Sequence, residues 1–280
     1  MADASVTRHY GRAGLIDEIL LALREAGLDP DNLQPADLAP LDQFHSRGRA
    51  ATEDVFAEFG VVEGGHVLDV GSGIGGPARF LAGKGLKVTG VDLTPEFVQV
   101  ARELTRRTMP VAPVEFVNAS ATSLPMADGA FDGAWMQHVS MNIESKEELF
   151  AELARVVRPG GRLAAHEVIA GPGGAAYLPA PWASAEGSSF LVREDAIREV
   201  LESAGWRIVA WRDDTPATLE FIAGLVARLD SLPRLSLRLL LGDRFAECFV
   251  NYARSLREDR CRIVIAIAER PSVAVWLVNP

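Results

Sequence analysis

A glycine-rich loop that follows an acidic residue is the first part of this chain whose residue types could do chemistry. In the segment 66–76, an apolar strand runs directly into four glycines, and Pro77 comes next. Glycine adopts positive φ easily and lets a ligand approach where a Cβ atom would collide. A helix that opens at Pro77 turns its free N–H groups toward such a ligand. We therefore predict a nucleotide-cofactor site at Gly71, Ser72 and Gly73.

Two carboxylates indicate which cofactor this is. Gly71, Gly73 and Gly76 also fit the G-x-G-x-x-G spacing of a dinucleotide site, so the loop alone leaves two cofactors open. Asp69, two residues before the first glycine, would crowd a pyrophosphate but would attract a cation. Asp92 ends a second apolar strand 21 residues after Gly71, where a carboxylate can bind both hydroxyls of a ribose. An adenosine with a cationic tail fits both acids, and S-adenosyl-L-methionine is that ligand.

At this point the chain, from about Asp42 to Pro271, resembles the class I S-adenosylmethionine-dependent methyltransferases. Four blocks match in order: residues 68–75 as motif I, 90–93 with the ribose acid, 123–132 leading into strand four, and 153–163 as the helix, turn and strand after it. With the upstream segment 42–52, the chain is most similar to the small-molecule enzymes of this class, such as the sarcosine/dimethylglycine, sugar O- and prenyl C-methyltransferases. The resemblance implies an α/β, Rossmann-like sheet of seven strands in the order 3-2-1-4-5-7-6, with strand 7 antiparallel.

The same resemblance assigns the adenine end of the site. Leu93 would flank the adenine, and Ser120 and Ala121 would lie at its edge. The family usually has Gly-Asp-Ala before the Leu-Pro of this region, whereas this chain has Ala-Ser-Ala at 119–121. A serine hydroxyl can accept a hydrogen bond from the adenine amino group as an uncharged partner. We therefore expect Ser120 to contact adenine with less charge assistance than an aspartate would give.

At the methionine end, the resemblance implies contacts from two further segments. Phe44 and Gly48 would close over the cofactor, with Arg47 offering its guanidinium to the methionine carboxylate. The alternative is that these residues only begin a helix. Gln137 would touch the methionine part at the end of strand four.

Three side chains could serve the acceptor. His138 follows strand four, at the sheet edge where open α/β sheets bind ligands, and is a candidate base or a plain polar loop residue. Glu167 aligns with the acidic base of some sugar O-methyltransferases. Because neighbouring strand residues point to opposite faces, only one of His166 and Glu167 should face the site, and we expect it to be Glu167. The alternative for both is a hydrogen bond into a neighbouring loop.

Bulk properties exclude several classes of function. The net charge of −10 and pI of about 5.1 disfavour a nucleic-acid substrate, and no apolar run approaches the ~20 residues of a membrane span. The two cysteines are too few for a disulfide framework. The first ten residues lack a secretory signal pattern, so a cytoplasmic location is expected. No carboxylate cluster indicates a metal site, so we expect a metal-independent reaction.

Strand and helix patterns alternate from residue 66 to 169 and predict a doubly wound parallel sheet. We assign residues 1–60 to an N-terminal helical cap and 61–280 to the catalytic core. Within the core, 171–192 is a glycine- and proline-rich lid, in which Tyr177, Trp182 and Phe190 could line an acceptor pocket, and 215–257 is a helical insertion. The N-terminal helices could pair or swap, which makes a homodimer one expectation.

The predicted function is metal-independent methyl transfer to the oxygen, nitrogen or carbon of a small molecule, such as a natural product, by in-line displacement. Three alternatives stay open. The chain could be a cyclase or isomerase that holds S-adenosylmethionine without using its methyl group, or a nonenzymatic sensor of that cofactor. More distantly, it could be a dehydrogenase.

Overall fold

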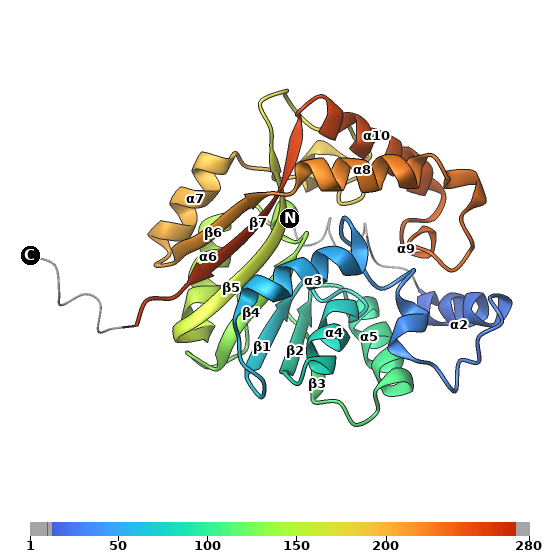
Figure 1. Ribbon diagram of the computed structural model, residues 1–280, viewed down its shortest axis with the longest axis horizontal. Helices are drawn as coiled ribbons and strands as arrows, with labels where there is room; N and C mark the ends of the chain where they lie inside the picture. The colour runs from blue at the N-terminus through green and yellow to red at the C-terminus, as the bar shows by residue number, and fades with distance from the viewer. Residues whose placement is uncertain (1–9, 11–12, 273–280) are drawn as a thin grey trace, which may run out of the picture.

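The computed structural model describes residue 10 and residues 13–272 of the chain. Seven strands form one sheet in the order β3-β2-β1-β4-β5-β7-β6 (Figure 1). They are β1 (His66–Val70), β2 (Lys87–Asp92), β3 (Val114–Asn118), β4 (Phe131–Gln137), β5 (Val157–Ala170), β6 (Arg207–Asp213) and β7 (Cys261–Glu269). The first five pair in parallel, and β7 runs antiparallel to both β5 and β6. The expected strand order and the antiparallel last strand are confirmed.

Helices cover both faces of the sheet. One face carries α3 (Gly48–Phe59), α4 (Gly76–Gly83) and α5 (Pro95–Thr108), and the other carries α6 (Lys146–Val156) and α7 (Glu194–Ser203). Each helix has an apolar stripe that packs on the strands. The central strands are buried on both faces and are therefore almost continuously apolar, as in β4 and β7.

The N-terminal segment packs beside α5 rather than on the sheet. Helix α2 (Leu15–Glu25) and the 3₁₀ helix η1 (Pro35–Leu38) share an apolar cluster with α5 and with α9 (Arg238–Leu241). In this cluster Ile19 and Leu23 are fully buried. The predicted lack of a secretory signal concerns residues 1–10, of which all but residue 10 lie outside the described part of the chain.

The predicted insertion is helical and packs above the carboxyl end of β5 and the amino end of β7 (Figure 1). It contains α8 (Thr215–Val226), the 3₁₀ helices η4 (Leu229–Ser231) and η5 (Gly242–Arg244) on either side of α9, and α10 (Phe245–Arg257). Helices α8 and α10 lie side by side. The segment 171–192 is mostly irregular, with one 3₁₀ turn, η3 (Glu186–Ser188), and packs against α10.

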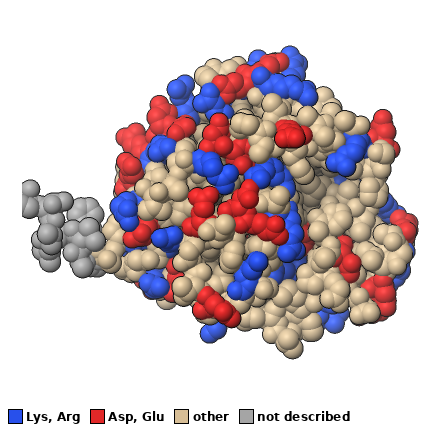
Figure 2. Space-filling view, in the orientation of Figure 1, with Lys and Arg blue, Asp and Glu red and all other residues tan. Residues whose placement is uncertain are grey.

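Charges on the surface are mixed. Figure 2 shows acidic and basic side chains interspersed over the face that carries α3. None of the helices in the described residues combines the length and apolar character that a bilayer crossing requires.

Candidate active site

The ends of the first four strands open onto a cleft of about 1030 Å³, part of which is exposed to solvent. Its wall includes Gly73 after β1, Asp92 at the end of β2, Ser120 after β3 and Gln137 at the end of β4. Phe44, from the segment before α3, closes one side. Parallel strands bring their carboxyl ends to one edge, which explains why residues so distant in sequence share one cleft.

The loop after β1 needs its glycines for two different reasons. A Cβ atom on Gly71 would lie 2.5 Å from Cγ2 of Val139, so this glycine lets the loops after β1 and β4 touch. At Gly73 the φ angle is +52°, and a Cβ atom there would meet nothing within 4 Å. The backbone at Gly73 therefore borders open space in the cleft, as expected for a loop on which a ligand rests.

Asp92 is held in place before any ligand binds. Its Oδ2 accepts a hydrogen bond from the N–H of Gly73 at 2.9 Å, and its Oδ1 accepts one from the N–H of Thr94 at 2.8 Å. A carboxylate has about four acceptor sites. The remaining lone pairs are available to a pair of ribose hydroxyls, as predicted from the sequence.

Buried polar atoms without partners surround the same loop. They are Oδ2 of Asp69, Oγ of Ser72 and Nε2 of Gln137. Burial, followed by the charge of Asp92, raises the pKa of the Asp69 carboxyl, and burial also raises the pKa of Asp92. Two buried carboxylates with spare acceptor capacity suit a ligand that carries positive charge and donors. These residues fit S-adenosylmethionine.

Asp69 acts from behind the loop. Ser72 and Gln137 line the cleft, whereas Asp69 is 2% exposed and is not part of its wall. A backbone hydrogen bond from Ala78, in the first turns of α4, reaches its carboxylate. Asp69 can therefore act on a ligand in the cleft only through its charge, because none of its surface borders the cleft.

Three residues that we expected at the adenine end border the cleft. They are Leu93, Ser120 and Ala121, and Thr122 lines it as well. The Oγ of Ser120 lies 3.0 Å from Oγ1 of Thr122, so the two hydroxyls form a pair at this end. The contact of Ser120 with adenine stays a prediction.

The segment before α3 contributes Phe44 but not the two residues after it that we expected. Gly48 begins α3 and does not border the cleft. Arg47, instead of pointing at the cofactor site, pairs with Asp214 at 2.7 Å and with Asp54 at 2.6 Å. The expected guanidinium contact is therefore not supported by this geometry.

A buried ion pair joins this segment to the glycine loop. Nη2 of Arg79, in α4, contacts Oδ2 of Asp42 at 2.9 Å, and both side chains are almost fully buried. Gly76 makes the approach feasible, because a Cβ atom there would lie 1.8 Å from the carbonyl oxygen of Asp42. The upstream segment and the cofactor loop are thus packed as one unit.

A second hollow of about 450 Å³, part of which is open to solvent, adjoins the cleft, and we call it the acceptor chamber. Tyr10, Phe44, His45 and His138 line both spaces and form their boundary. The rest of the chamber is mainly apolar and includes Met141, Trp182, Phe221, Leu237, Phe249 and Tyr252.

His138 stands at this boundary in an unusual conformation. Its φ angle is +57°, in the left-handed region that non-glycine residues rarely adopt. The N–H of His138 donates to the carbonyl oxygen of His166 at 2.8 Å. Burial, and then the charges of His166 and His45, hold the pKa of His138 well below its ordinary value. The imidazole is therefore neutral near pH 7 and can accept a proton.

Glu167 holds the turn that presents His138. Its Oε1 accepts from the N–H of Val139 at 3.1 Å, and its Oε2 accepts from the N–H and the hydroxyl of Ser140 at 2.9 and 2.6 Å. Burial raises its pKa to about 7, and it borders neither the cleft nor the chamber. The expectation that Glu167 faces the acceptor is not supported by this geometry, because its carboxylate is used by the loop after β4.

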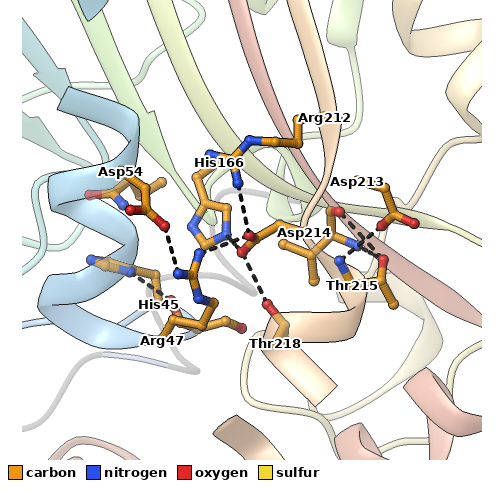
Figure 3. A network of polar contacts seen from close by, with 12 residues as sticks. His45, Arg47, Asp54, His166, Arg212, Asp213, Asp214, Thr215 and Thr218 are labelled. Carbon is orange, nitrogen blue, oxygen red and sulfur yellow. Dashed lines mark hydrogen bonds and ion pairs between the residues drawn. The ribbon is translucent and has the colours of Figure 1, made fainter. Parts of the chain in front are cut away.

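Of the neighbouring pair, His166 packs against the two histidines at the boundary, although it lines neither the cleft nor the chamber itself. Its ring centroid lies 4.9 Å from that of His138 and 6.0 Å from that of His45. Its Nε2 is 3.2 Å from Oδ2 of Asp214, whose other oxygen pairs with Arg47 (Figure 3). Burial would raise the pKa of Asp214, but the hydrogen bonds from His166 and Arg47 outweigh it and lower that pKa. The ionised Asp214 therefore fixes an N–H on Nε2 of His166.

That tautomer leaves a lone pair on Nδ1 of His166. Nδ1 is buried and has no hydrogen-bond partner, and the same holds for Nε2 of His138 in the adjacent ring. His138 therefore offers a buried ring nitrogen without a partner, beside a second ring that the carboxylate of Asp214 holds in place.

Sequence reasoning missed Tyr10 and Asp214, and it expected His45 only to close over the cofactor. Tyr10 donates from its hydroxyl to Oδ1 of Asn142 at 3.2 Å and lines both spaces. His45 was noted only as part of the upstream segment, and Asp214 only follows a strand on the far side of β7. The one available signal was position, since Asp214 directly follows β6.

Of the three lid aromatics, one reaches the chamber. Trp182 lines it and donates from Nε1 to Oγ of Ser189 at 3.0 Å. The ring of Tyr177 instead lies under the guanidinium of Arg254, and Phe190 borders neither space. Across residues 10 and 13–272, no group of three or more His, Cys, Asp or Glu side chains is arranged to hold a metal ion.

Comparisons with known proteins agree with this site. Residues 68–165 match the family model described as a methyltransferase domain. The chain is 36% identical over 134 residues to methyltransferase GfsG of Streptomyces halstedii, and the match covers 48% of each protein. This part of the chain is therefore similar to a methyltransferase domain. The chain spans 48%, 59% and 62% of the lengths of three curated relatives that it matches.

Two solved structures resemble this chain over most of its length. Phosphoethanolamine N-methyltransferase 2 of Haemonchus contortus aligns with a TM-score of 0.72 at 20% identity, covering 93% of this chain and 59% of that one. The [4+2]-cyclase SpnF aligns with a TM-score of 0.66 at 25% identity, covering 92% and 96%. Both alignments show a similar fold.

Proposed function

We propose that this chain transfers a methyl group from S-adenosylmethionine to a small-molecule acceptor held in the acceptor chamber. The observation that carries the proposal is the shared boundary of two spaces. A cleft fitted to an adenosine with a cationic tail meets a largely apolar chamber at His138. Donor and acceptor bound in adjoining spaces would have their reacting atoms brought together there.

The residues of the cleft have separable roles in this proposal. Asp92 binds the ribose hydroxyls, while Leu93, Ser120 and Ala121 hold the adenine. Gly71, Ser72, Gly73 and Gln137 hold the amino-acid end, with Asp69 stabilising positive charge from behind the loop. Phe44 separates the cleft from solvent and borders the chamber. Gly48 supports Phe44 as the start of α3.

His138 is the proposed catalytic base, assisted in position by Glu167. When bound, the cofactor supplies an electrophilic methyl carbon: the acceptor's oxygen–carbon bond forms as the carbon–sulfur bond breaks, with that electron pair staying on sulfur. The hydroxyl proton passes to the neutral ring of His138. Glu167 contributes by fixing the turn at residues 138–140, and His166 and Asp214 keep the base oriented.

The test is direct. Purified protein is titrated with S-adenosylhomocysteine in a calorimeter and then incubated with S-adenosylmethionine, with and without candidate acceptors, while S-adenosylhomocysteine release is measured. We expect binding in the first experiment and acceptor-dependent release in the second. Full turnover in the presence of EDTA is expected as well. No binding would contradict the cofactor assignment, and loss of turnover restored by Mg²⁺ would contradict the metal-independent reaction.

A second candidate is a cyclase that keeps the cofactor intact. It is favoured by the likeness to a [4+2]-cyclase over nearly the full length of both chains. It predicts that the acceptor is converted to an isomer of unchanged mass while no S-adenosylhomocysteine is released. Mass spectrometry of the product therefore separates the two functions.

We also infer the setting in which the enzyme works. The net charge of −10 and the interspersed surface charges support a small-molecule partner rather than nucleic acid. A cytoplasmic location, a role in biosynthesis and a homodimer are part of the same proposal. Fractionation of cells and light scattering of the purified protein test the location and the dimer.

A further inference from the structure

We propose that the acceptor is an uncharged, mostly apolar molecule built on a flat ring system, which presents an acidic hydroxyl group to His138. The proposal rests on the proposed function and adds the chemical class of the acceptor to it. It is carried by the composition of the acceptor chamber, by the pairing of its polar side chains and by the character of His138 at its boundary.

The wall of the chamber carries no compensating charge. Of the twelve described residues that line it, none is Asp, Glu, Lys or Arg. Asp214 and Arg47, on the far side of His166, are not part of the wall and pair with each other. A phosphate or ammonium group moved into such a space would lose its hydration without gaining a counter-charge, at an effective cost of several kcal/mol. The chamber therefore selects against charged acceptors.

Its walls also favour a ring. Trp182 from the segment 171–192 and Tyr252 from α10 meet edge to face, with centroids 5.4 Å apart. Phe221 from α8 and Phe249 from α10 add further aromatic surface. Aromatic side chains bind flat rings through offset or edge contacts in addition to burying apolar area.

The polar side chains of the chamber are mostly occupied with each other. Oγ of Ser46 lies 2.8 Å from the hydroxyl of Tyr252, and Tyr10 bonds to Asn142. Both ring nitrogens of His45 have partners in its own segment, at the carbonyl oxygen of Ser46 and Oε1 of Gln43. His138 is the exception among the described lining side chains, since its Nε2 has none. A polar atom of the acceptor is therefore best placed at His138.

The base at this position limits which hydroxyl can react. Burial and the neighbouring rings lower the basicity of His138, so it accepts protons less readily than a free imidazole. A phenol has a pKa of about 10, whereas the pKa of a saturated alcohol is closer to that of water, which is about 16. Proton transfer becomes less efficient as the pKa values of donor and base move apart. A phenolic or enolic hydroxyl is consequently the group that His138 can serve.

The first test compares probes that share one ring system. With S-adenosylhomocysteine held at saturation, the full-length protein is titrated calorimetrically with 2-naphthol, 2-naphthyl phosphate and 2-naphthylmethylammonium. We expect 2-naphthol to bind at least about tenfold more tightly than either charged probe. Equal or tighter binding of a charged probe would overturn the proposal.

A matched pair of variants locates the binding to the chamber. Phe221 lines the chamber and is 39% exposed, and Val250 lies on α10 of the same insertion, is 46% exposed and is not part of the wall. F221K should change the ratio of 2-naphthyl phosphate to 2-naphthol affinity by about tenfold in favour of the phosphate. V250K, with the same added charge, should leave the ratio unchanged. Identical ratios in both variants would show that the probes bind elsewhere and would overturn the assignment.

A third measurement tests the hydroxyl. A panel of polycyclic phenols, each paired with its saturated alcohol, is incubated with the enzyme and S-adenosylmethionine. We expect methylation of phenols in the panel and of none of their saturated partners. This part of the proposal is overturned if an alcohol is methylated faster than its phenol, or if no phenol in the panel is methylated. Failure of the proposed function itself looks different, because S-adenosylhomocysteine would then either not bind in the calorimeter or not be released from S-adenosylmethionine with an acceptor of any class.

Discussion

At the scale of single residues, the site depends on how a few side chains are held. His138 keeps a left-handed backbone conformation because the Glu167 carboxylate accepts from the two following N–H groups. Such strain persists only where surrounding contacts fix it, and it is common at active sites. The carboxylate that we expected to be a base is therefore used to place one.

Replacing His138 by asparagine tests its role as the base. Asparagine tolerates the left-handed region, so H138N should fold normally while it loses the proton acceptor. We expect kcat to fall about 10²- to 10⁴-fold, with little change in the KM for S-adenosylmethionine. Steady-state kinetics on the acceptor found in the screen provide the measurement. H66N removes a histidine that borders neither space and serves as the control; an equal loss there would contradict the assignment.

The buried histidines also predict how stability varies with pH. Burial, followed by the charge of His166, lowers the pKa of His45 to about 3, from 6.5 in the unfolded chain. Between pH 6.5 and 3 the unfolded state binds a proton that the folded state does not. Each unit below pH 6.5 should thus remove about 1.4 kcal/mol of stability through this residue.

The variant H45Q lacks this proton uptake. The difference in unfolding free energy between wild type and H45Q should shrink by about 2 kcal/mol from pH 7 to pH 5. Urea denaturation at the two pH values measures it. An unchanged difference would show that His45 is charged in the folded protein.

At the scale of elements, the strand ends and the segment before α3 build the cleft together. Gly76 lies in the first turn of α4, directly under the backbone of Asp42. A methyl group there cannot be accommodated by side-chain movement, because the clashing atom is a carbonyl oxygen. The contact makes the cofactor loop and the upstream segment interdependent.

The variant G76A should therefore weaken cofactor binding by displacing the segment that carries Phe44. We expect the Kd for S-adenosylhomocysteine to rise at least tenfold, or about 1.4 kcal/mol. Gly83, at the other end of the same helix, has open space around its Cβ position, so G83A should bind like the wild type and gain up to about 1 kcal/mol in stability. Calorimetric titration of both variants tests the pair, and equal affinities would disprove the coupling.

The elements were largely predictable from the sequence, whereas the orientation of the site residues was not. Local patterns in the sequence are enough to find the apolar strands β1, β2 and β7 and the bounds of α3. Short-range sterics and burial determine these elements. Alternation along β5 showed that His166 and Glu167 face opposite ways, but not which face borders the chamber. That depends on α3 and on Asp214 after β6, which meet β5 only in the folded chain.

At the scale of the whole molecule, the cap and the insertion meet over the cleft. Leu235, Leu239 and Leu240 from the insertion share an apolar cluster with α2 and α5. Arg234 also pairs with Glu25 at 2.9 Å, although both are exposed and such a pair contributes little. Because these parts are packed together, ligand binding should stabilise the fold as a unit.

The temperature of thermal unfolding should therefore rise when S-adenosylhomocysteine is bound. S-adenosylhomocysteine at about 100 times its Kd should add about 2.7 kcal/mol to the unfolding free energy. For a chain of this size that corresponds to a rise in Tm of roughly 5 to 10 °C. NAD at the same concentration should have no effect. Stabilisation by NAD and not by S-adenosylhomocysteine would instead favour a dehydrogenase, and scanning calorimetry decides between them.

The division of the wall between core and insertion has a consequence for how this enzyme can be changed. The insertion supplies Phe221, Leu237, Phe249 and Tyr252 to the chamber, but only Leu240 to the cleft. Acceptor preference can consequently be altered by grafting residues 215–257 from a relative while the donor machinery is left intact. Chimeras would inherit their acceptor from the graft, which makes this fold a natural starting point for recombining methylation specificities.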